Sequence, residues 1–307
     1  MTPNRSTHTT ALPASAAGTS RLPGSTASCH VWALAPLSRP SSWFGLLDST
    51  EVARCSSFRQ EADLARFVTG RVLAKTALAF LVGSGPEAVR LLARCPDCGG
   101  PHGKPRVLGA AEGWELSISH SDERVVVAVS EGVPLGVDIE RFEPWQGSGL
   151  PPEYDLVLTA AERAALDRIP QERRARAALS YWTRKEAVLK ATGEGLNTPM
   201  TDFSLSGPDQ PPVLLGWHPA DGGRPVPAIA DIALDADYHA AVAALGVSTV
   251  LPTVHESVEL LPLLPAGVSA GGPAPDRLRS RVVRVLSTEV PRTPDSSGAR
   301  SQVTALV

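Results

Sequence analysis

Two carboxylates at the end of an apolar segment constrain this chain more than any other feature. Residues 134–140 read Pro-Leu-Gly-Val-Asp-Ile-Glu, and this pattern predicts a strand on which Asp138 and Glu140 point to the same face. Two like charges at the end of a buried strand repel each other unless a cation lies between them. Oxygen ligands of this kind suit magnesium, which commonly brings phosphates. A solvated strand end is the alternative, and the pair alone leaves both interpretations open.

A second segment, residues 182–190, supplies a third carboxylate and two lysines. It lies in a predicted helix over about residues 172–192 that ends at the next glycine. Trp182, Glu186 and Lys190 are four apart and share one face of this helix. Lys185 lies about 100° round the helix and, on geometry alone, is the lysine more expected at the surface. Glu186 and Lys190 also have the order of a surface ion pair, but together with the strand pair they indicate phosphate chemistry at a magnesium site.

Composition narrows the class of protein. The 307 residues are 43% hydrophobic and carry a formal net charge of −3, which argues against a dedicated nucleic-acid binder. No apolar run approaches the ~20 residues that cross a bilayer, and the first residues lack the apolar core of a secretory signal. Four cysteines in a chain of this length do not form a disulfide framework. We therefore expect a cytoplasmic protein that binds neither membrane nor nucleic acid.

The chain divides into four parts by composition. Residues 1–28 lack acidic and aromatic side chains and are predicted to be a disordered extension. Residues 251–307 are predicted to be a Pro/Gly-rich, mostly disordered tail, with a short basic helix at 277–286. Between them, residues 29–134 and 135–250 are predicted to form an α+β fold of two similar α/β halves in tandem, each a small, mainly antiparallel sheet packed with helices.

Local patterns place several elements within these halves. Apolar periodicity predicts a helix over 62–80, and alternation predicts a hairpin of 114–119 and 125–129. Thr159 and Glu162 have the spacing of a capping box, which predicts that a helix begins there. Short strands are predicted at 203–205, 213–216, 231–234 and 238–245.

Basic and hydroxyl side chains elsewhere are weaker candidates for ligand contacts. Lys104 and Pro105 lie in a stiff loop where a lysine can contact phosphate, although most such loops are only turns. Ser119 and His120 close a predicted strand, where a histidine is more often structural than a ligand. Two arginines and a lysine of the first helix either reach an anionic ligand or form a solvated face; they are Arg66, Arg71 and Lys75.

A cysteine pair raises a separate alternative. Cys95, Cys98 and His102 have the spacing of three ligands of a zinc site. No fourth ligand is evident in the sequence, so reduced thiols in a tight turn are the more favoured interpretation and structural zinc the less favoured one.

Taken in chain order, four segments resemble the signature of the 4′-phosphopantetheinyl transferases, in the large monomeric class often called surfactin-type. The resemblance covers roughly residues 40–245, and residues 66–71 also resemble the family's early coenzyme-binding helix. The four segments are Gly103-Lys104-Pro105, Ser119-His120-Ser121, Gly136-Val137-Asp138-Ile139-Glu140 and Trp182-x-x-Lys185-Glu186-x-x-x-Lys190.

The resemblance implies a holo-acyl-carrier-protein synthase type of reaction. The 4′-phosphopantetheine arm of coenzyme A would move to a serine of an apo carrier protein, leaving adenosine 3′,5′-bisphosphate. By analogy, Mg²⁺ would be held by Asp138, Glu140 and Glu186. Contacts to coenzyme A would come from Arg66, Arg71, Lys104, Pro105, Ser119, His120, Lys185 and Lys190. The two lysines Lys185 and Lys190 would stabilise charge on the pyrophosphate.

The serine must also lose a proton, and a carboxylate is the expected acceptor. Glu186 is the first candidate for this catalytic base and Glu162 the second. The implied partners are acyl carrier, peptidyl carrier or polyketide-synthase carrier domains of fatty acid, peptide or polyketide biosynthesis, and the implied state is a monomer. Two alternatives from other classes stand beside this interpretation: a magnesium-dependent nuclease, which the negative net charge disfavours, and a zinc-stapled, non-catalytic binding module.

Overall fold

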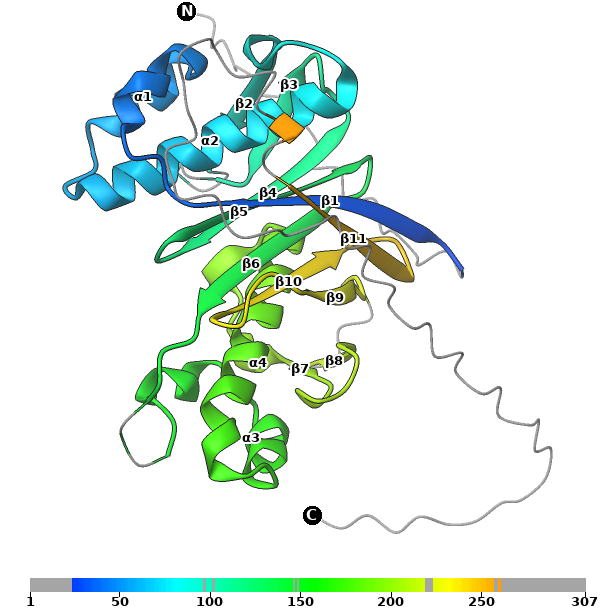
Figure 1. The fold of residues 1–307 in the computed structure, drawn as a ribbon. Coiled ribbons are helices and arrows are strands. Elements are labelled where there is room, and N and C mark those ends of the chain that lie inside the picture. Colours follow the sequence, from blue (N-terminus) through cyan, green and yellow to red (C-terminus); the bar gives the residue numbers. More distant parts are fainter. Residues whose placement is uncertain are drawn as a thin grey trace, which may run out of the picture.

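A computed structural model of the chain describes residues 24–260, except 96–97, 101–102, 146, 148, 219–222 and 257–258. Two sheets lie back to back between helices, with α1 and α2 above them and α3 and α4 below in Figure 1. Among the described residues, no helix is both long and apolar enough to cross a membrane.

The first sheet has four strands in the order β11-β1-β5-β4. β1 and β11 run parallel, whereas β1–β5 and β5–β4 are antiparallel. The strands are β1 (Thr26–Leu34), β4 (Trp114–Ser121), β5 (Arg124–Glu131) and β11 (Thr249–His255). On its outer side the sheet meets α1 (Ser49–Cys55), α2 (Glu61–Val82), the hairpin of β2 (Val89–Ala93) and β3 (Pro105–Gly109), and the 3-10 turns Pro40–Leu46 and Pro86–Ala88.

The second sheet has the order β6-β10-β9 and is antiparallel throughout. Its strands are β6 (Leu135–Arg141), β9 (Ala228–Ile232) and β10 (Tyr238–Ala244). The elements packed below it are α3 (Ala160–Asp167), α4 (Gln171–Thr192), the two-stranded sheet of β7 (Phe203–Leu205) and β8 (Leu214–Trp217), and the 3-10 turns Pro152–Leu156, Gly195–Asn197 and Met200–Asp202.

Strand alternation explains the layering. In β5, Val126 and Ala128 face the second sheet, whereas Val127 and Val129 face α2. In β10, Val242 faces the first sheet and its neighbours on the chain face α4. Because successive side chains point to opposite faces, a strand buried on both sides must be apolar throughout. The result is a helix–sheet–sheet–helix core, and the predicted α+β class, with mainly antiparallel sheets packed with helices, is confirmed.

Most of the local predictions agree with these elements, but the strand predicted at 231–234 begins earlier, as β9 at Ala228–Ile232. The predicted 62–80 helix is α2, the hairpin is β4–β5, and the capping box of Thr159 and Glu162 opens α3. α4 ends at Gly193, whose φ of 78° is the left-handed conformation expected of a C-terminal glycine. The tandem relationship between the two halves stays a prediction.

Two predicted boundaries fall inside strands. The extension placed at 1–28 includes the start of β1, and the tail placed at 251–307 includes most of β11. Thr26 pairs with Thr249 across this parallel contact, and buried Ala27 and Cys29 fill the space between the sheets. Ordering of both segments therefore depends on a pairing between the two ends of the fold. The helix predicted at 277–286 lies outside the described residues.

Gly136 sets the distance between β6 and α4. A Cβ atom at this position would lie 2.2 Å from the carbonyl oxygen of Ala187 and 2.3 Å from the amide nitrogen of Ala191. Only glycine permits such an approach of backbone to backbone. The close contact brings Asp138, two residues later on β6, next to the C-terminal half of α4.

Candidate active site

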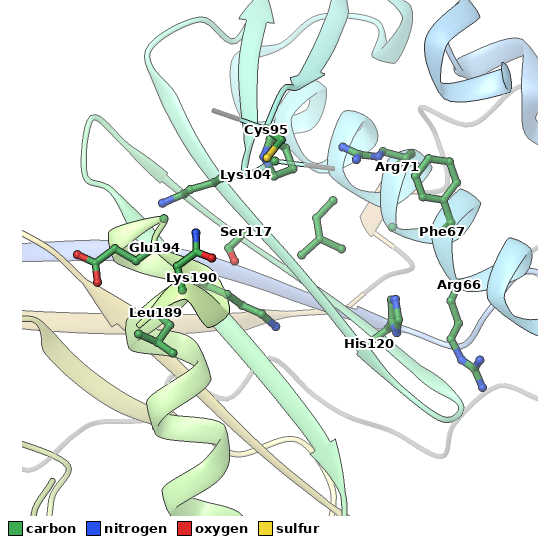
Figure 2. Close-up of a pocket in the computed structure, with 17 residues that line it drawn as sticks. Arg66, Phe67, Arg71, Cys95, Lys104, Ser117, His120, Leu189, Lys190 and Glu194 are labelled. Carbon is green, nitrogen blue, oxygen red and sulfur yellow. The ribbon is translucent and has the colours of Figure 1, made fainter. Parts of the chain in front are cut away.

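A cavity of about 500 Å³ lies between α2, β4 and the end of α4 (Figure 2). It brings together residues from four separate parts of the chain: α2, the loop before β3, β4, and the segment from Leu189 to Asn197. The predicted contact residues that line it are Arg66, Arg71, Lys104, Pro105, His120 and Lys190. The cavity is thus built where three of the four sequence segments meet.

The cavity is basic. Arg66, Arg71, Lys104 and Lys190 line it, and Glu194 is the acidic side chain among the described lining residues. Opposed cations in a partly buried space repel one another unless an anion joins them. The composition of the wall therefore suits a ligand with several negative charges.

The two arginines of α2 are held by neighbouring side chains. Arg71 is 8% exposed, and its Nε lies 3.7 Å from Oε1 of Glu51, while its guanidinium carbon lies 5.2 Å from the centroid of the Phe67 ring. Burial lowers the pKa of Arg71, and the charge of Glu51 opposes that shift. Arg66 donates to the carbonyl of Asp122 at 2.8 Å and pairs with a carboxylate of its own helix. Both cations are positioned before any ligand arrives.

Lys104 and His120 also line the cavity, with His120 beside Arg66 in Figure 2. Lys104 Nζ donates to the carbonyl oxygen of Ala191 at 3.0 Å, and burial lowers its pKa. The loop reaches this place because Gly103 passes close to Arg94, where a Cβ would lie 2.2 Å from the carbonyl oxygen. The pKa of His120 is lowered by burial first, then by the charges of Arg66 and Lys190. Burial and the neighbouring cations therefore both favour the neutral imidazole.

Next to the cavity, Asp138 joins the strand β6 to α4. Its Oδ1 lies 2.6 Å from Lys190 Nζ and accepts from Ser119 Oγ at 2.7 Å, and Lys190 also donates to Ser119 at 2.8 Å. Asp138 is 2% exposed, and its Oδ2 has no hydrogen-bond partner within the described structure. A buried carboxylate oxygen without a donor is costly, so this atom is open to a ligand that carries positive charge.

The three predicted metal ligands influence one another. The pKa of Glu140 is raised to about 7, first by burial and then by the charge of Asp138, with Ser121 and Lys190 opposing and Glu186 adding to the rise. The pKa of Glu186 is raised by burial and by Asp138, and Lys190 opposes this. Mutual repulsion of this kind is relieved by a cation.

The fit to a metal ion is incomplete as the side chains stand. Among the residues that the structure describes, no three His, Cys, Asp or Glu side chains are gathered into a group that could hold an ion. Lys190 instead neutralises Asp138. The donor set and the unpartnered Oδ2 suit a hard divalent cation, and the role of the three carboxylates as its ligands stays a prediction.

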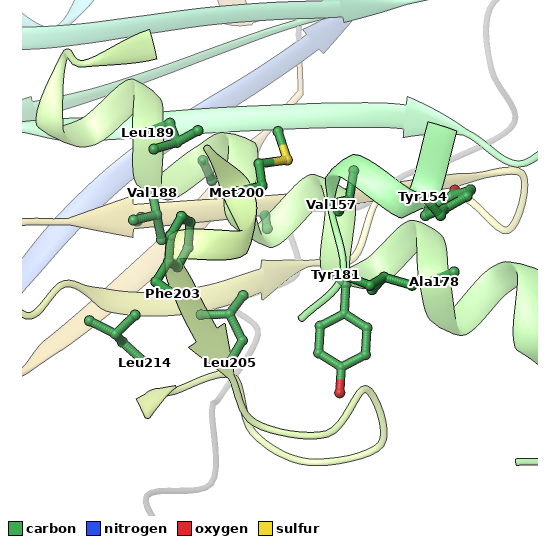
Figure 3. Close-up of a cluster of buried hydrophobic side chains, with 14 of the residues drawn as sticks. Tyr154, Val157, Ala178, Tyr181, Val188, Leu189, Met200, Phe203, Leu205 and Leu214 are labelled. Atoms are coloured by element: carbon green, nitrogen blue, oxygen red, sulfur yellow. The ribbon is translucent and has the colours of Figure 1, made fainter. Parts of the chain in front are cut away.

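Lys185 and Glu162, by contrast, are not at the cavity. Lys185 is fully buried, and its Nζ donates to Glu162 Oε2 at 2.7 Å and to the carbonyl oxygens of Val157, Met200 and Phe203 at 2.8–2.9 Å. Those three residues belong to the apolar cluster below the second sheet (Figure 3). A lysine with four acceptors in a closed core is a structural group. The predicted phosphate contact of Lys185 and the predicted base role of Glu162 would both require side chains that here bind each other away from the cavity.

The cysteine pair divides between two environments. Cys95 is buried and lines the cavity, whereas Cys98 is exposed and its sulfur accepts a long hydrogen bond from the amide of Gly100. His102 lies outside the described residues. The zinc alternative is therefore not tested by the part of the chain that the structure describes.

Three residues of the site were not among the predictions. Glu51 pairs with Arg71 and Lys75, Phe67 packs against Arg71, and Ser121 donates to Glu140. Glu51 gives no signal of this kind, because its contacts with Arg71 and Lys75 join α1 to α2 and depend on tertiary packing. Phe67 does give one, since it stands four residues before Arg71 on the same helix. Ser121 does give one: it stands two residues from Ser119 on a strand, just as Glu140 stands two residues from Asp138.

Comparison with known proteins identifies the family. The model of the 4′-phosphopantetheinyl transferase superfamily matches residues 134–243. The 4′-phosphopantetheinyl transferase HetI of Nostoc sp. is 30% identical over 181 residues, which cover 54% of this chain and 69% of HetI. A putative 4′-phosphopantetheinyl transferase of Synechocystis sp. is 28% identical, over 55% of this chain and 66% of its own length. A 4′-phosphopantetheinyl transferase of Bacillus subtilis is 27% identical, over 50% and 62%. The chain belongs to the 4′-phosphopantetheinyl transferase superfamily.

Proposed function

We propose that this protein transfers the 4′-phosphopantetheine arm of coenzyme A to a serine of an apo carrier protein, giving the holo carrier and adenosine 3′,5′-bisphosphate. The observation that carries the proposal is a basic cavity of about 500 Å³ next to a buried, mutually repelling group of carboxylates. A ligand with several phosphates satisfies the first feature, and a divalent cation on its pyrophosphate satisfies the second.

Coenzyme A would lie in the cavity with its phosphates toward the cations. Arg66, Arg71, Lys104 and His120 line the cavity, so phosphates of both ends of the nucleotide would find partners. Pro105 stiffens the loop that carries Lys104. Ser119 is not among the described residues that line the cavity, and it would act by holding Lys190 and Asp138.

Mg²⁺ would be held by Asp138, Glu140 and Glu186. When bound, it supplies neutralisation of the pyrophosphate oxygens as a Lewis acid. Lys190 and Glu186 would have further roles in the reaction. Lys190, 2.6 Å from Asp138, adds a positive charge on the same side and stabilises the charge that gathers on the departing nucleotide.

Glu186 is the residue we assign as general base. The serine Oγ–H proton passes to its carboxylate, a P–O bond forms between Oγ and the phosphorus of the phosphopantetheine arm, and the P–O bond to adenosine 3′,5′-bisphosphate breaks. Burial raises the pKa of Glu186, which makes it a better proton acceptor than an exposed glutamate. Glu162 is not carried forward, because its charge is committed to Lys185.

The partners in this proposal are carrier domains of polyketide, nonribosomal peptide or fatty acid synthesis, acting with a monomeric, cytoplasmic enzyme of the large surfactin-type class. The presence of both halves of the site on one chain supports this class, since α2 and β4 supply the cavity wall and β6 and α4 supply the carboxylates.

Calorimetric titration of coenzyme A tests the proposal at its binding step. We expect affinity that rises with MgCl₂, a loss of that rise in Glu186→Gln, and weaker binding in Lys190→Met whether or not magnesium is present. Binding that is unaffected by both substitutions would contradict the placement of the ligand. Absence of binding to the wild-type chain would contradict the function.

A further inference from the structure

The strands β4 and β6 are the facing edges of two separate sheets. β4 ends the order β11-β1-β5-β4, and β6 begins the order β6-β10-β9. Edge strands present unpaired backbone groups that need partners. Here the partners are side chains, because hydroxyl groups of β4 reach the backbone of β6.

Three serines at alternate positions of β4 bind residues of β6, two of them through the backbone, and we call them the serine ladder: Ser117, Ser119 and Ser121. Ser117 Oγ accepts from the amide of Val137 at 3.0 Å, and Ser121 Oγ accepts from the amide of Arg141 at 3.1 Å. Alternate residues of a strand share one face. The ladder is therefore a single row of hydroxyls along the seam between the two sheets.

The second and third members of the row also hold carboxylates. Ser119 donates to Asp138 Oδ1 at 2.7 Å, and Ser121 donates to Glu140 Oε2 at 2.8 Å. The two-residue spacing of the serines matches the two-residue spacing of the acids, so each carboxylate meets its own hydroxyl.

The hydroxyl of Ser121 is fixed from both sides. A serine has one O–H donor and accepts through its lone pairs. In Ser121 the donor is committed to Glu140, and a lone pair is committed to the rigid amide of Arg141. Because both its donor and a lone pair are engaged, Ser121 holds the Glu140 carboxylate in one orientation. That carboxylate belongs to the proposed cation site.

We propose that Ser121 is a positioning residue for a divalent cation: it fixes the carboxylate of Glu140 beside Asp138, as Ser119 fixes Asp138 itself. This inference rests on the proposed function, because the cation it serves is the one placed on the pyrophosphate. Ser121 touches neither the ligand nor the reacting atoms, and its effect is exerted through Glu140. Ser119 shares the role but also holds Lys190, so Ser121 is the cleaner test.

The ladder supplies its own control. Ser117 lies on the same face of the same strand and also accepts a backbone amide of β6, but this bond involves no carboxylate. Since Ser117 also lines the cavity, it serves as a control for metal binding and not for coenzyme A binding. Ser117→Ala removes a hydroxyl from the seam without altering a cation ligand. Ser121→Thr keeps the hydroxyl of Ser121 and tests whether it alone restores the effect.

The experiment is a titration of the full chain with Mn²⁺ at pH 8, with free Mn²⁺ followed by electron paramagnetic resonance, with and without coenzyme A. Loss of a group that orients a ligand typically weakens metal binding about 10-fold or more, and we expect that loss in Ser121→Ala. In the titration without coenzyme A, we expect Ser117→Ala to bind Mn²⁺ within about twofold of wild type and Ser121→Thr to recover most of the affinity. Coenzyme A affinity without metal should be unchanged in Ser121→Ala.

Equal Mn²⁺ affinity in Ser121→Ala and wild type would overturn the inference, and so would an equal loss in Ser117→Ala. A wild-type chain that binds coenzyme A but not Mn²⁺ would overturn the inference and leave the ligand assignment intact. A wild-type chain that binds neither would overturn the proposed function and the inference with it.

Discussion

Replacement of Lys185 by methionine separates a structural lysine from a catalytic one. The side chain is fully buried, and its Nζ has four acceptors, one of them the Glu162 carboxylate at 2.7 Å. Glu162 also accepts from the amides of Thr159 and Leu205. In Lys185→Met the carboxylate keeps those two amides but loses its counter-ion.

The expected cost follows from this geometry. Removal of one partner of a buried ion pair destabilises a protein by about 3–5 kcal/mol, because the other charge stays buried without compensation. With a urea m-value of about 2 kcal/mol/M, the unfolding midpoint of Lys185→Met should fall by about 1.5–2.5 M. Glu162→Gln in the same chain removes the stranded charge, so the double variant should recover about 1 kcal/mol or more relative to Lys185→Met.

The assay is equilibrium urea unfolding, followed by coenzyme A titration of the folded variant at low temperature. Arg173→Met is the matched control: it lies on the same helix, in an exposed pair with Asp209, and should leave the midpoint unchanged. The reasoning is refuted if Lys185→Met unfolds at the wild-type midpoint. It is refuted equally if the folded variant loses coenzyme A affinity, since that is the behaviour of a phosphate ligand.

Three further predictions follow from single positions. Gly136→Ala places a Cβ 2.2 Å from the backbone of α4 and should cost about 3 kcal/mol; Gly216→Ala, where no atom lies within 4 Å, should cost far less in the same unfolding assay. Burial raises the pKa of Glu140 from 4.5 to about 7, so between these pH values the folded chain keeps a proton that the unfolded chain has released, and stability falls as pH rises. Glu140→Gln should therefore raise Tm at pH 8 and leave it unchanged at pH 4. An equal effect on Tm at both pH values would contradict the shift. Lys104→Ala should weaken coenzyme A binding about 10-fold by calorimetry, whereas exposed Arg106→Ala, two residues away, should not; similar losses would point to a general charge effect.

Local signals explain how much of the site could be predicted. Asp138, Glu186 and Lys190 were expected together because strand alternation and helical periodicity place each on a defined face, and the glycine at the end of α4 marks where the face stops. Gly136 stands in the predicted motif, but glycine is required there because the backbone of β6 contacts the backbone of α4. No local sequence pattern indicates that contact.

Tertiary packing explains what could not be predicted. Helical geometry shows that Lys185 lies off the face of Glu186, but not whether that other face meets water or a core. α3, opened by the Thr159 capping box, covers it and supplies Glu162. The pairing of Thr26 with Thr249 joins residues at opposite ends of the fold, and neither segment carries a signal for the other.

The most direct measurement is the intact mass of an apo carrier protein after incubation with this protein, coenzyme A and MgCl₂. We expect a gain of one phosphopantetheine per carrier, absent without magnesium and absent with Glu186→Ala. An unchanged mass across polyketide, peptide and fatty acid carriers would contradict the proposed function. A gain that persists with Glu186→Ala would contradict the assignment of the base.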